Sequence, residues 1–342
     1  MNSERVLTAP RQASRAATAS ASRLALYALF LAAAVSPLLR VRVPALVDYP
    51  DHLARMWILA RHGTIPALAA NYQIHWRILP DLAMDLIVPP LSQVMPIDAA
   101  GRVFIGLTIV GLIGGTATLH RALHGRWAVW PLWSALFVYN AVLFWGFLNC
   151  LFGIAVALFA LSGWMATRDW RPAFRIPLFS AAASVLFLLH LFAFGFYGLC
   201  VALYEIDRRI RQRQAVVAGA SSLLVVGAQF LPGLVLWYVS LRHAGPTLTR
   251  YGDLADKLHA LMAPFTFGYI PAPFDLVVAL LALTFLTWAI GTRALTLAAE
   301  FRRPLAVMAV VAMAMPNTLS GSWAADLRLP VALTFLLIAA SR

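Results

Sequence analysis

The sequence predicts an all-α polytopic membrane protein with about ten transmembrane helices, several of them short, and a long first extracytoplasmic loop that carries interfacial helices. Of the 342 residues, 61% are hydrophobic and only 12% are charged, with a mean hydropathy of +0.78. That composition is too apolar for a soluble domain. Apolar runs long enough to cross the ~30 Å hydrocarbon core of a bilayer recur along the chain. We therefore expect a tail at residues 1–22 followed by one transmembrane domain at 23–342.

The net charge of +13 does not indicate nucleic-acid binding in this chain. The basic residues, all arginine except Lys257, lie mostly in the connections between apolar runs, where positive charge sets the orientation of a membrane protein. Cys150 and Cys200 fall inside apolar runs and form neither a disulfide framework nor a CxxC metal motif. We expect both cysteines to be small buried hydrophobic residues.

The N-terminal residues 1–22 are rich in Ala, Ser and Arg and have no apolar periodicity, which predicts a disordered cytoplasmic tail. A signal peptide fits poorly, because no small-residue cleavage site follows the apolar run at 24–39. This run is the first predicted span. Arg40 and Arg42 end it, and Pro44 prevents the helix from continuing.

Residues 41–100 form the long first loop, in which prolines and polar residues alternate with aromatic ones. Such a length is typical of a functional loop rather than of a connection. Within it, residues 51–62 place apolar side chains at helical spacing and predict a helix lying in the membrane interface. Residues 82–88 predict a second helix of this kind.

The later apolar runs predict the remaining spans. The run at 128–166 would be about 58 Å long as one helix, so we divide it at residues 145–149. We divide the run at 176–206 near His190, because two spans keep the neighbouring arginine clusters on one side. Further spans are predicted at 101–119, 215–241, 274–290, 304–319 and from 329 onward. The last run is shorter than a bilayer requires, so either the chain is truncated or a partner completes that helix.

This arrangement separates the charges across the membrane. The arginine-rich connections share the side of the tail, which the positive-inside rule makes the cytoplasm. We therefore expect a multi-pass protein of a bacterial inner membrane, with a second extracytoplasmic loop at 242–273. Nine acidic residues fall on the outer side: Asp48, Asp51, Asp81, Asp85, Asp98, Asp253, Asp256, Asp275 and Asp326.

Asp48 and Asp51 are the candidate catalytic residues, with His52 and Arg55 beside them as candidate substrate ligands. A carboxylate next to a hydroxyl group can accept its proton as the transition state forms. Two structural interpretations compete with this one. Asp48 and Asp51 can cap a helix that starts at Pro50, and Asp51 can pair with Arg55 one helical turn later.

Four further polar positions at the outer face are candidates, each with a structural alternative. Asp81, with Asp48 and Asp51, could supply oxygen ligands to a divalent cation such as Mg²⁺ or Mn²⁺, or simply face solvent. His190 can bind a phosphate or donate to a leaving group, or can satisfy a nearby carbonyl; Asn149 has the same two interpretations. Arg328 can clamp a phosphate, or can extend toward the interface as many membrane arginines do.

These features resemble the GT-C class of membrane glycosyltransferases. The resemblance rests on Asp48 and Asp51 in Asp-Tyr-Pro-Asp-His, on the Trp-Gly-Phe-Leu-Asn turn that ends at Asn149, on His190, and on Arg328 in Leu-Arg-Leu-Pro. It implies a sugar donor carried on a polyprenyl phosphate among the membrane lipids, and an outer-face carboxylate that activates the acceptor. By the same resemblance, Asp51 or Asp48 is the base, and Arg328 and His190 hold the lipid phosphate.

Two other functional classes remain open from the sequence. A transporter or flippase would place ionisable residues near the bilayer midplane and show repeated halves. This chain places its carboxylates at one face and shows no internal repeat, which favours the enzyme. A noncatalytic membrane scaffold is the third alternative.

Overall fold

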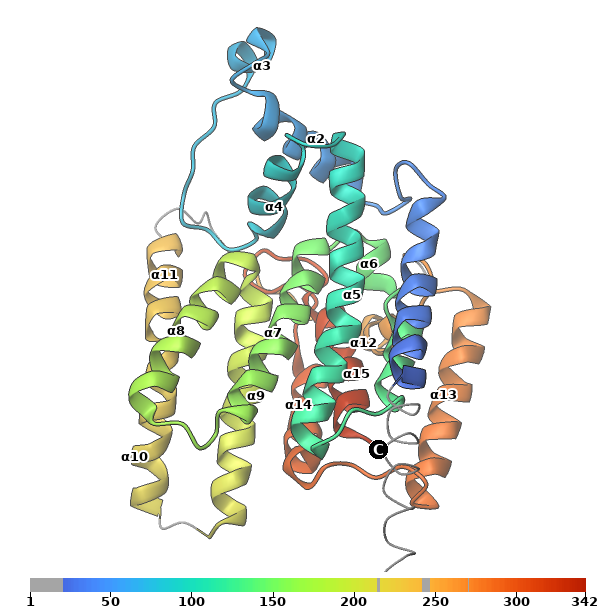
Figure 1. The fold of residues 1–342 in the computed structure, drawn as a ribbon, viewed down its shortest axis with the longest axis vertical. Helices are drawn as coiled ribbons and strands as arrows, with labels where there is room; N and C mark the ends of the chain where they lie inside the picture. The colour runs from blue at the N-terminus through green and yellow to red at the C-terminus, as the bar shows by residue number, and fades with distance from the viewer. Residues whose placement is uncertain (1–20, 214–215, 242–246, 270) are drawn as a thin grey trace, which may run out of the picture.

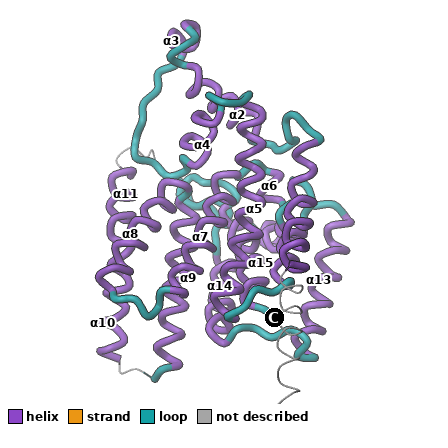
Figure 2. Tube along the Cα trace, viewed as in Figure 1, coloured by secondary structure: helices purple, strands orange, loops and turns teal. Residues whose placement is uncertain are grey.

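The computed structural model describes residues 21–213, 216–241, 247–269 and 271–342 as a bundle of helices (Figures 1 and 2). Within these residues there is no named strand, and only three isolated β-bridges are formed. Nearly all of the predicted tail at 1–22 lies outside the described residues. The fold is that of an all-α membrane protein.

Six described helices are long and apolar enough to cross a membrane. They are Ala21–Leu39, α5 (Ile97–His124), α7 (Leu148–Ala166), α8 (Pro172–Leu189), Gly219–Leu241 and α13 (Pro273–Gly291). Helices α9 (Leu191–Arg211), α14 (Ala299–Ala314) and α15 (Ala325–Ala340) lie in the same bundle but do not meet both conditions. The predicted number of about ten spans is therefore not confirmed.

The first half of the apolar run at 128–166 is not the spanning helix that the sequence predicted. It forms the 3-10 helix η2 (Trp130–Phe137) and the single turn α6 (Ala141–Phe144). Asn140 separates them: its amide donates to the carbonyl of Phe137, and its side-chain oxygen caps α6 through the backbone N–H of Leu143. The predicted breaks near residues 145–149 and at His190 are both confirmed.

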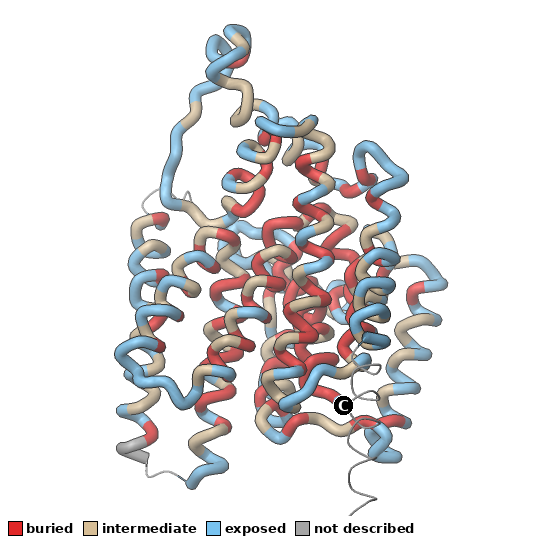
Figure 3. The backbone as a smooth tube through the Cα atoms, viewed as in Figure 1, coloured by how far each residue is buried: buried red, intermediate tan, exposed pale blue. Residues whose placement is uncertain are grey.

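The centre of the bundle is formed by α5 and α7. In their most apolar windows, 61% of α5 and 72% of α7 is buried, against 11% for Ala21–Leu39 and for α13, which lie at the periphery (Figure 3). Glycines allow the close packing. A Cβ added at Gly115 would come within 2.9 Å of the Leu158 Cβ. Helices of membrane proteins approach most closely where such small residues meet.

Three short helices stand at one end of the bundle, which we call the loop end (Figure 1). They are α2 (Tyr49–Arg61), α3 (Pro66–Asn71) and α4 (Ala83–Leu91). Both predicted helices of the long loop are present, and α3 was not predicted. Proline occupies the first turn of α2 and α3, where its missing N–H costs nothing.

The opposite end, which we call the arginine end, carries the arginine-rich connections after α5, α7, α9 and α13 (Figure 1). The run at 215–241 forms α10 (Val216–Gly227), η3 (Ala228–Phe230) and α11 (Leu231–Leu241). The second predicted loop, at 242–273, contains α12 (Leu254–Met262), which begins with a capping box between Asp253 and Asp256. Residues 242–246 and 270 of that loop lie outside the described residues.

Candidate functional site

Asp81 ends an extended arm, residues 72–82, that runs from α3 back to the bundle (Figure 2). Its backbone has a φ of +79°, a conformation that costs energy in a residue other than glycine. Asn149, in the first turn of α7, holds this conformation from both sides. Its Nδ2 donates to the carbonyl of Asp81 at 3.0 Å, and its Oδ1 accepts from the N–H of Met84 at 2.8 Å. The predicted residue Asn149 thus positions Asp81 through the backbone.

His190 lies beside Asp81 at the junction of α8 and α9. Its Nδ1 accepts a hydrogen bond from the backbone N–H of Phe192 at 3.0 Å, so in the neutral imidazole the proton is on Nε2. That Nε2 lies 3.7 Å from Oδ1 of Asp81, too long for a hydrogen bond in this state. The ring therefore presents a donor toward the carboxylate.

Arg328, in the first turn of α15, has no carboxylate partner among the described residues. Its Nη1 donates to Oγ of Ser322 at 2.8 Å, and its Nη2 donates to the carbonyl of Trp323 at 3.2 Å. The guanidinium stands 5.0 Å from the centre of the Phe147 ring. Its Nε is buried without a partner in the described part of the chain. Arg328 is thus a fixed cation whose charge is not neutralised.

These residues share one electrostatic environment. Burial raises the pKa of Asp81, while the hydrogen bond from Asn149 and the charges of His52 and Arg328 lower it. The side chain nevertheless keeps 56% of its surface accessible. Asp81 is therefore a reachable carboxyl group that interacts with the charge of Arg328. We call Asp81, Asn149, His190 and Arg328 the Asp81 cluster.

Arg55 does not pair with Asp51. Instead its Nε donates to Oδ1 of the buried Asp85 at 2.7 Å, which ties α2 to α4. The predicted pair one helical turn apart within α2 is therefore wrong. His52, in the same helix, lies near enough to Asp81 for its charge to lower the pKa of that carboxyl group.

Asp48 and Asp51 occupy the N-cap and the first turn of α2, as one structural interpretation expected, but they do not make the hydrogen bonds of a cap. Asp48 precedes α2, but its carboxylate makes no capping hydrogen bond. Its backbone N–H donates to the carbonyl of Trp145 at 3.1 Å, next to Gly146, whose φ is +90°. Asp51 is exposed. The positions that the capping interpretation gives to Asp48 and Asp51 are therefore confirmed, but its side-chain hydrogen bond is not formed. Neither carboxylate makes a hydrogen bond or ion pair within the described residues. Their catalytic role stays a prediction.

The predicted metal ligands do not come together to form a divalent-cation site. Among the described residues, no three His, Cys, Asp or Glu side chains gather in a way that could hold a metal ion. Asp48, Asp51 and Asp81 thus do not form one ligand set. Cys150 and Cys200 are buried free thiols, as expected.

Three further residues complete the site, of which only Phe147 belongs to a turn that the sequence singled out. Ser322, Trp323 and Phe147 hold or cover the guanidinium of Arg328. Their signal in the sequence is weak, because Ser and Trp before an arginine at a helix start are ordinary residues for a membrane interface. The chain matches no known protein family, no curated protein and no solved structure. The functional argument therefore depends on the geometry of the site.

Proposed function

We propose that this protein is a glycosyltransferase of the bacterial inner membrane, which moves a sugar from a polyprenyl-phosphate donor to an acceptor at the extracytoplasmic face. The observation that carries the proposal is the convergence of the Asp81 cluster. Its members come from the long loop, the start of α7, the junction of α8 and α9, and the start of α15. A carboxylate and an unpaired cation thus come together from distant parts of the chain.

Arg328 is the group that we assign to the donor phosphate. A guanidinium binds phosphate oxygens through paired N–H groups and remains charged under all physiological conditions. Within the described residues its Nε makes no hydrogen bond, and no carboxylate forms an ion pair with its guanidinium group. A lipid-linked donor reaches such a site sideways from the bilayer, with its phosphate at the level of the helix ends.

Asp81 is the group that we assign to the acceptor hydroxyl. The acceptor oxygen forms a bond to the anomeric carbon, and the bond between that carbon and the phosphate oxygen breaks. The hydroxyl proton passes to the Asp81 carboxylate, and the electron pair leaves on the polyprenyl phosphate, which Arg328 stabilises. Asp48 and Asp51, which the GT-C resemblance nominates, are the competing candidates for the base.

His190 and Asn149 are positioning residues in this scheme. Asn149 fixes the backbone of Asp81. The Nε2–H of His190 faces the carboxylate at 3.7 Å, which is too far for a hydrogen bond, so the carboxylate can still accept a proton from the acceptor. Orientation follows from the arginine end, because arginine-rich connections remain in the cytoplasm. The loop end then faces the extracytoplasmic space.

The experiment is mass spectrometry of lipid-linked sugars in a strain that lacks the gene. We expect a polyprenyl-phosphate sugar to accumulate, and to disappear when the wild-type chain is restored. Asp81→Asn, present at the same level in the membrane, should leave the accumulation in place. Asp51→Asn and Asp48→Asn should restore turnover if Asp81 is the base. No accumulation in the deletion strain would contradict the proposal.

A further inference from the structure

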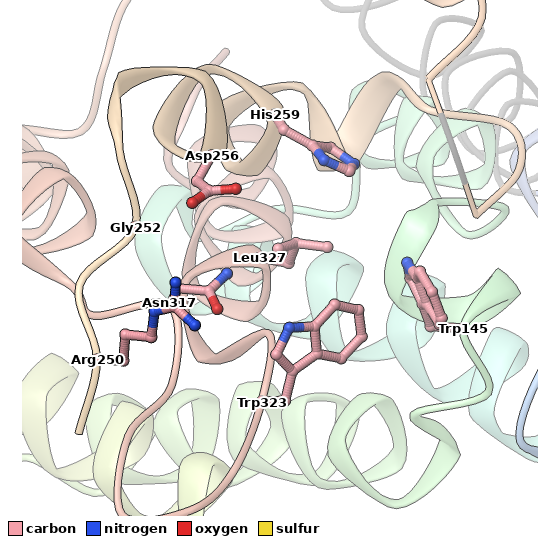
Figure 4. A pocket seen from close by; sticks show the side chains of 8 residues that line it. All are labelled: Trp145, Arg250, Gly252, Asp256, His259, Asn317, Trp323 and Leu327. Atoms are coloured by element: carbon pink, nitrogen blue, oxygen red, sulfur yellow. The ribbon is translucent and has the colours of Figure 1, made fainter. Parts of the chain in front are cut away.

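A cavity of ≈ 270 Å³ lies beside Arg328, at the start of α15 (Figure 4). Its side chains come from the turn before α7, from α12 and the segment before it, and from the segment before α15. The side chains that argue for a ligand are Trp145, Arg250, Asp256, His259, Asn317 and Trp323. The volume is near the lower end of small-molecule pockets, about 300–1,000 Å³, so it suits a single ring rather than a chain of rings.

The cavity has one aromatic side and one polar side. The indoles of Trp145 and Trp323 meet edge to face, with ring centres 4.7 Å apart. Across from them, the side chains of Arg250, Asp256 and Asn317 come together (Figure 4). Aromatic rings offer an apolar surface, while carboxylate and amide groups exchange hydrogen bonds with hydroxyl groups.

Two polar atoms on this lining are buried without a partner. Nε1 of Trp145 and Nε2 of His259 make no hydrogen bond within the described residues. A buried polar group left without a partner destabilises the fold. Both atoms are closed to solvent, so the polar groups that a ligand can reach directly are those of Arg250, Asp256 and Asn317, which suit a ligand with several hydroxyl groups.

The charges of the lining argue against an anionic ligand. The negative charge of Asp256 offsets the positive charge of Arg250. Within the described residues the Asp256 carboxylate accepts one hydrogen bond, at Oδ2, from the backbone N–H of Asp253 at 3.1 Å. A phosphate would face that carboxylate directly. A neutral ring with hydroxyl groups would instead donate to Asp256 and accept from Arg250.

The cavity adjoins the Asp81 cluster through Trp323. Its ring centre lies 6.4 Å from that of Phe147, and its carbonyl accepts a hydrogen bond from Arg328. We infer that this cavity is a sugar subsite, which holds one neutral pyranose ring between Trp145, Trp323 and Asp256. The inference rests on the proposed function and extends it, because it assigns the sugar of the reaction to residues outside the Asp81 cluster.

Binding is tested by saturation-transfer NMR on the full chain in detergent, with the methyl glycosides of glucose, galactose and mannose as probes. At least one glycoside should give a signal that inorganic phosphate does not remove. Asp256→Asn should weaken that signal at least fivefold. Asp253→Asn is the matched control, since it belongs to the same capping box but does not line the cavity.

Several results would overturn the assignment. They are the absence of a signal for all three glycosides, displacement by phosphate, and equal losses in Asp253→Asn and Asp256→Asn at equal thermal stability. If both variants lose stability equally, Trp145→Leu replaces them: it keeps an apolar side chain but removes the indole surface that lines the cavity, and it must weaken binding.

The two proposals fail separately. Asp81→Asn should bind the glycoside as the wild-type chain does while it transfers no sugar. Glycoside binding without any accumulation of lipid-linked sugar in the deletion strain would leave the subsite standing and reject the transferase. Accumulation of the lipid-linked sugar without glycoside binding would support the transferase and reject the subsite.

Discussion

At the arginine end of the bundle Glu205 has several close partners, whereas at the loop end Asp81 has no cation within hydrogen-bond distance among the described residues. Glu205 is 1% exposed and accepts from Trp164 Nε1 at 2.9 Å and from Arg209 Nη1 at 2.6 Å, with Arg175 and Arg208 at 3.8 and 3.7 Å. Asp81 has one histidine at 3.7 Å. A buried carboxylate with several close cations joins helices, whereas a reachable one with no cation within hydrogen-bond distance is available for chemistry.

The same contrast holds for the neighbouring charges. Asp207 pairs with Arg211 at 2.7 Å and with Arg303 at 3.3 Å, which links α9 to α14. At the loop end, Arg328 keeps a free Nε, and the carboxylates of Asp48 and Asp51 make no bond among the described residues. The acidic residues of α9 thus stabilise the bundle through close ion pairs, whereas the Asp81 cluster leaves its charges without such pairs in the described chain, although Arg55 and Asp85 do pair elsewhere at the loop end.

The largest expected effect is at the arginine end. Glu205→Gln removes the charge that balances Arg175, Arg208 and Arg209, and breaking a buried ion-pair network of this kind costs about 3–5 kcal/mol. Thermal unfolding of the purified chain in detergent measures the loss. The control is Asp169→Asn, an exposed carboxylate 3.6 Å from Arg168, for which we expect at most about 1 kcal/mol. Equal shifts for the two variants would remove the distinction between paired and unpaired charges.

A smaller effect is expected where α2 packs on α5. A Cβ at Gly101 would lie 2.2 Å from the Tyr49 hydroxyl oxygen, so Gly101→Ala should cost about 1–3 kcal/mol by overpacking. Adding Tyr49→Phe removes the clashing oxygen, which has no hydrogen-bond partner in the described chain, and should restore much of the loss. Gly106→Ala is the control, since its Cβ would meet nothing closer than 3.8 Å.

If the double variant were no more stable than Gly101→Ala alone, the packing of α2 on α5 would be wrong. The position of the whole loop end would then need revision, because α2 carries His52 and Arg55.

The smallest effect on folding is the pH dependence from Asp81. Burial raises its pKa above the usual 3.8, so the folded chain favours the protonated carboxyl group. Its contribution to stability is present below pH 3.8 and is lost as the pH rises through the raised pKa. The rate of sugar transfer should instead increase as the pH rises through this pKa, because the base must be ionised. A pH profile of transfer that falls across this range would contradict the role of Asp81.

Local patterns in the sequence predicted much of the fold. Apolar runs and arginine clusters predicted the helical bundle, the turn at His190 and the break before Asn149, because each depends on a few neighbouring residues. The run at 128–144 was predicted wrongly, since its composition is that of a span while Asn140 and the proline at the start of η2 interrupt it. Length and hydropathy do not reveal that interruption.

The site was only partly predictable, because its geometry depends on contacts between distant segments. His190, Asn149 and Arg328 stood out as polar residues at helix ends. Asp81 was noticed only as a possible metal ligand, since its proposed role as a base depends on Asn149 and Arg328, which lie far along the chain. The cavity beside Trp323 has no local motif, because its lining comes from three separate parts of the chain.

The central claim is that Asp81 serves sugar transfer and does not stabilise the fold. It is tested most directly by measuring unfolding and sugar transfer together for Asp81→Asn. Transfer should fall about 10²–10⁴-fold, the usual contribution of a general base. The melting temperature should stay the same or rise, because the amide removes a carboxylate whose ionised form the fold disfavours. A lower melting temperature with transfer retained would show that Asp81 is a structural residue and would contradict the account.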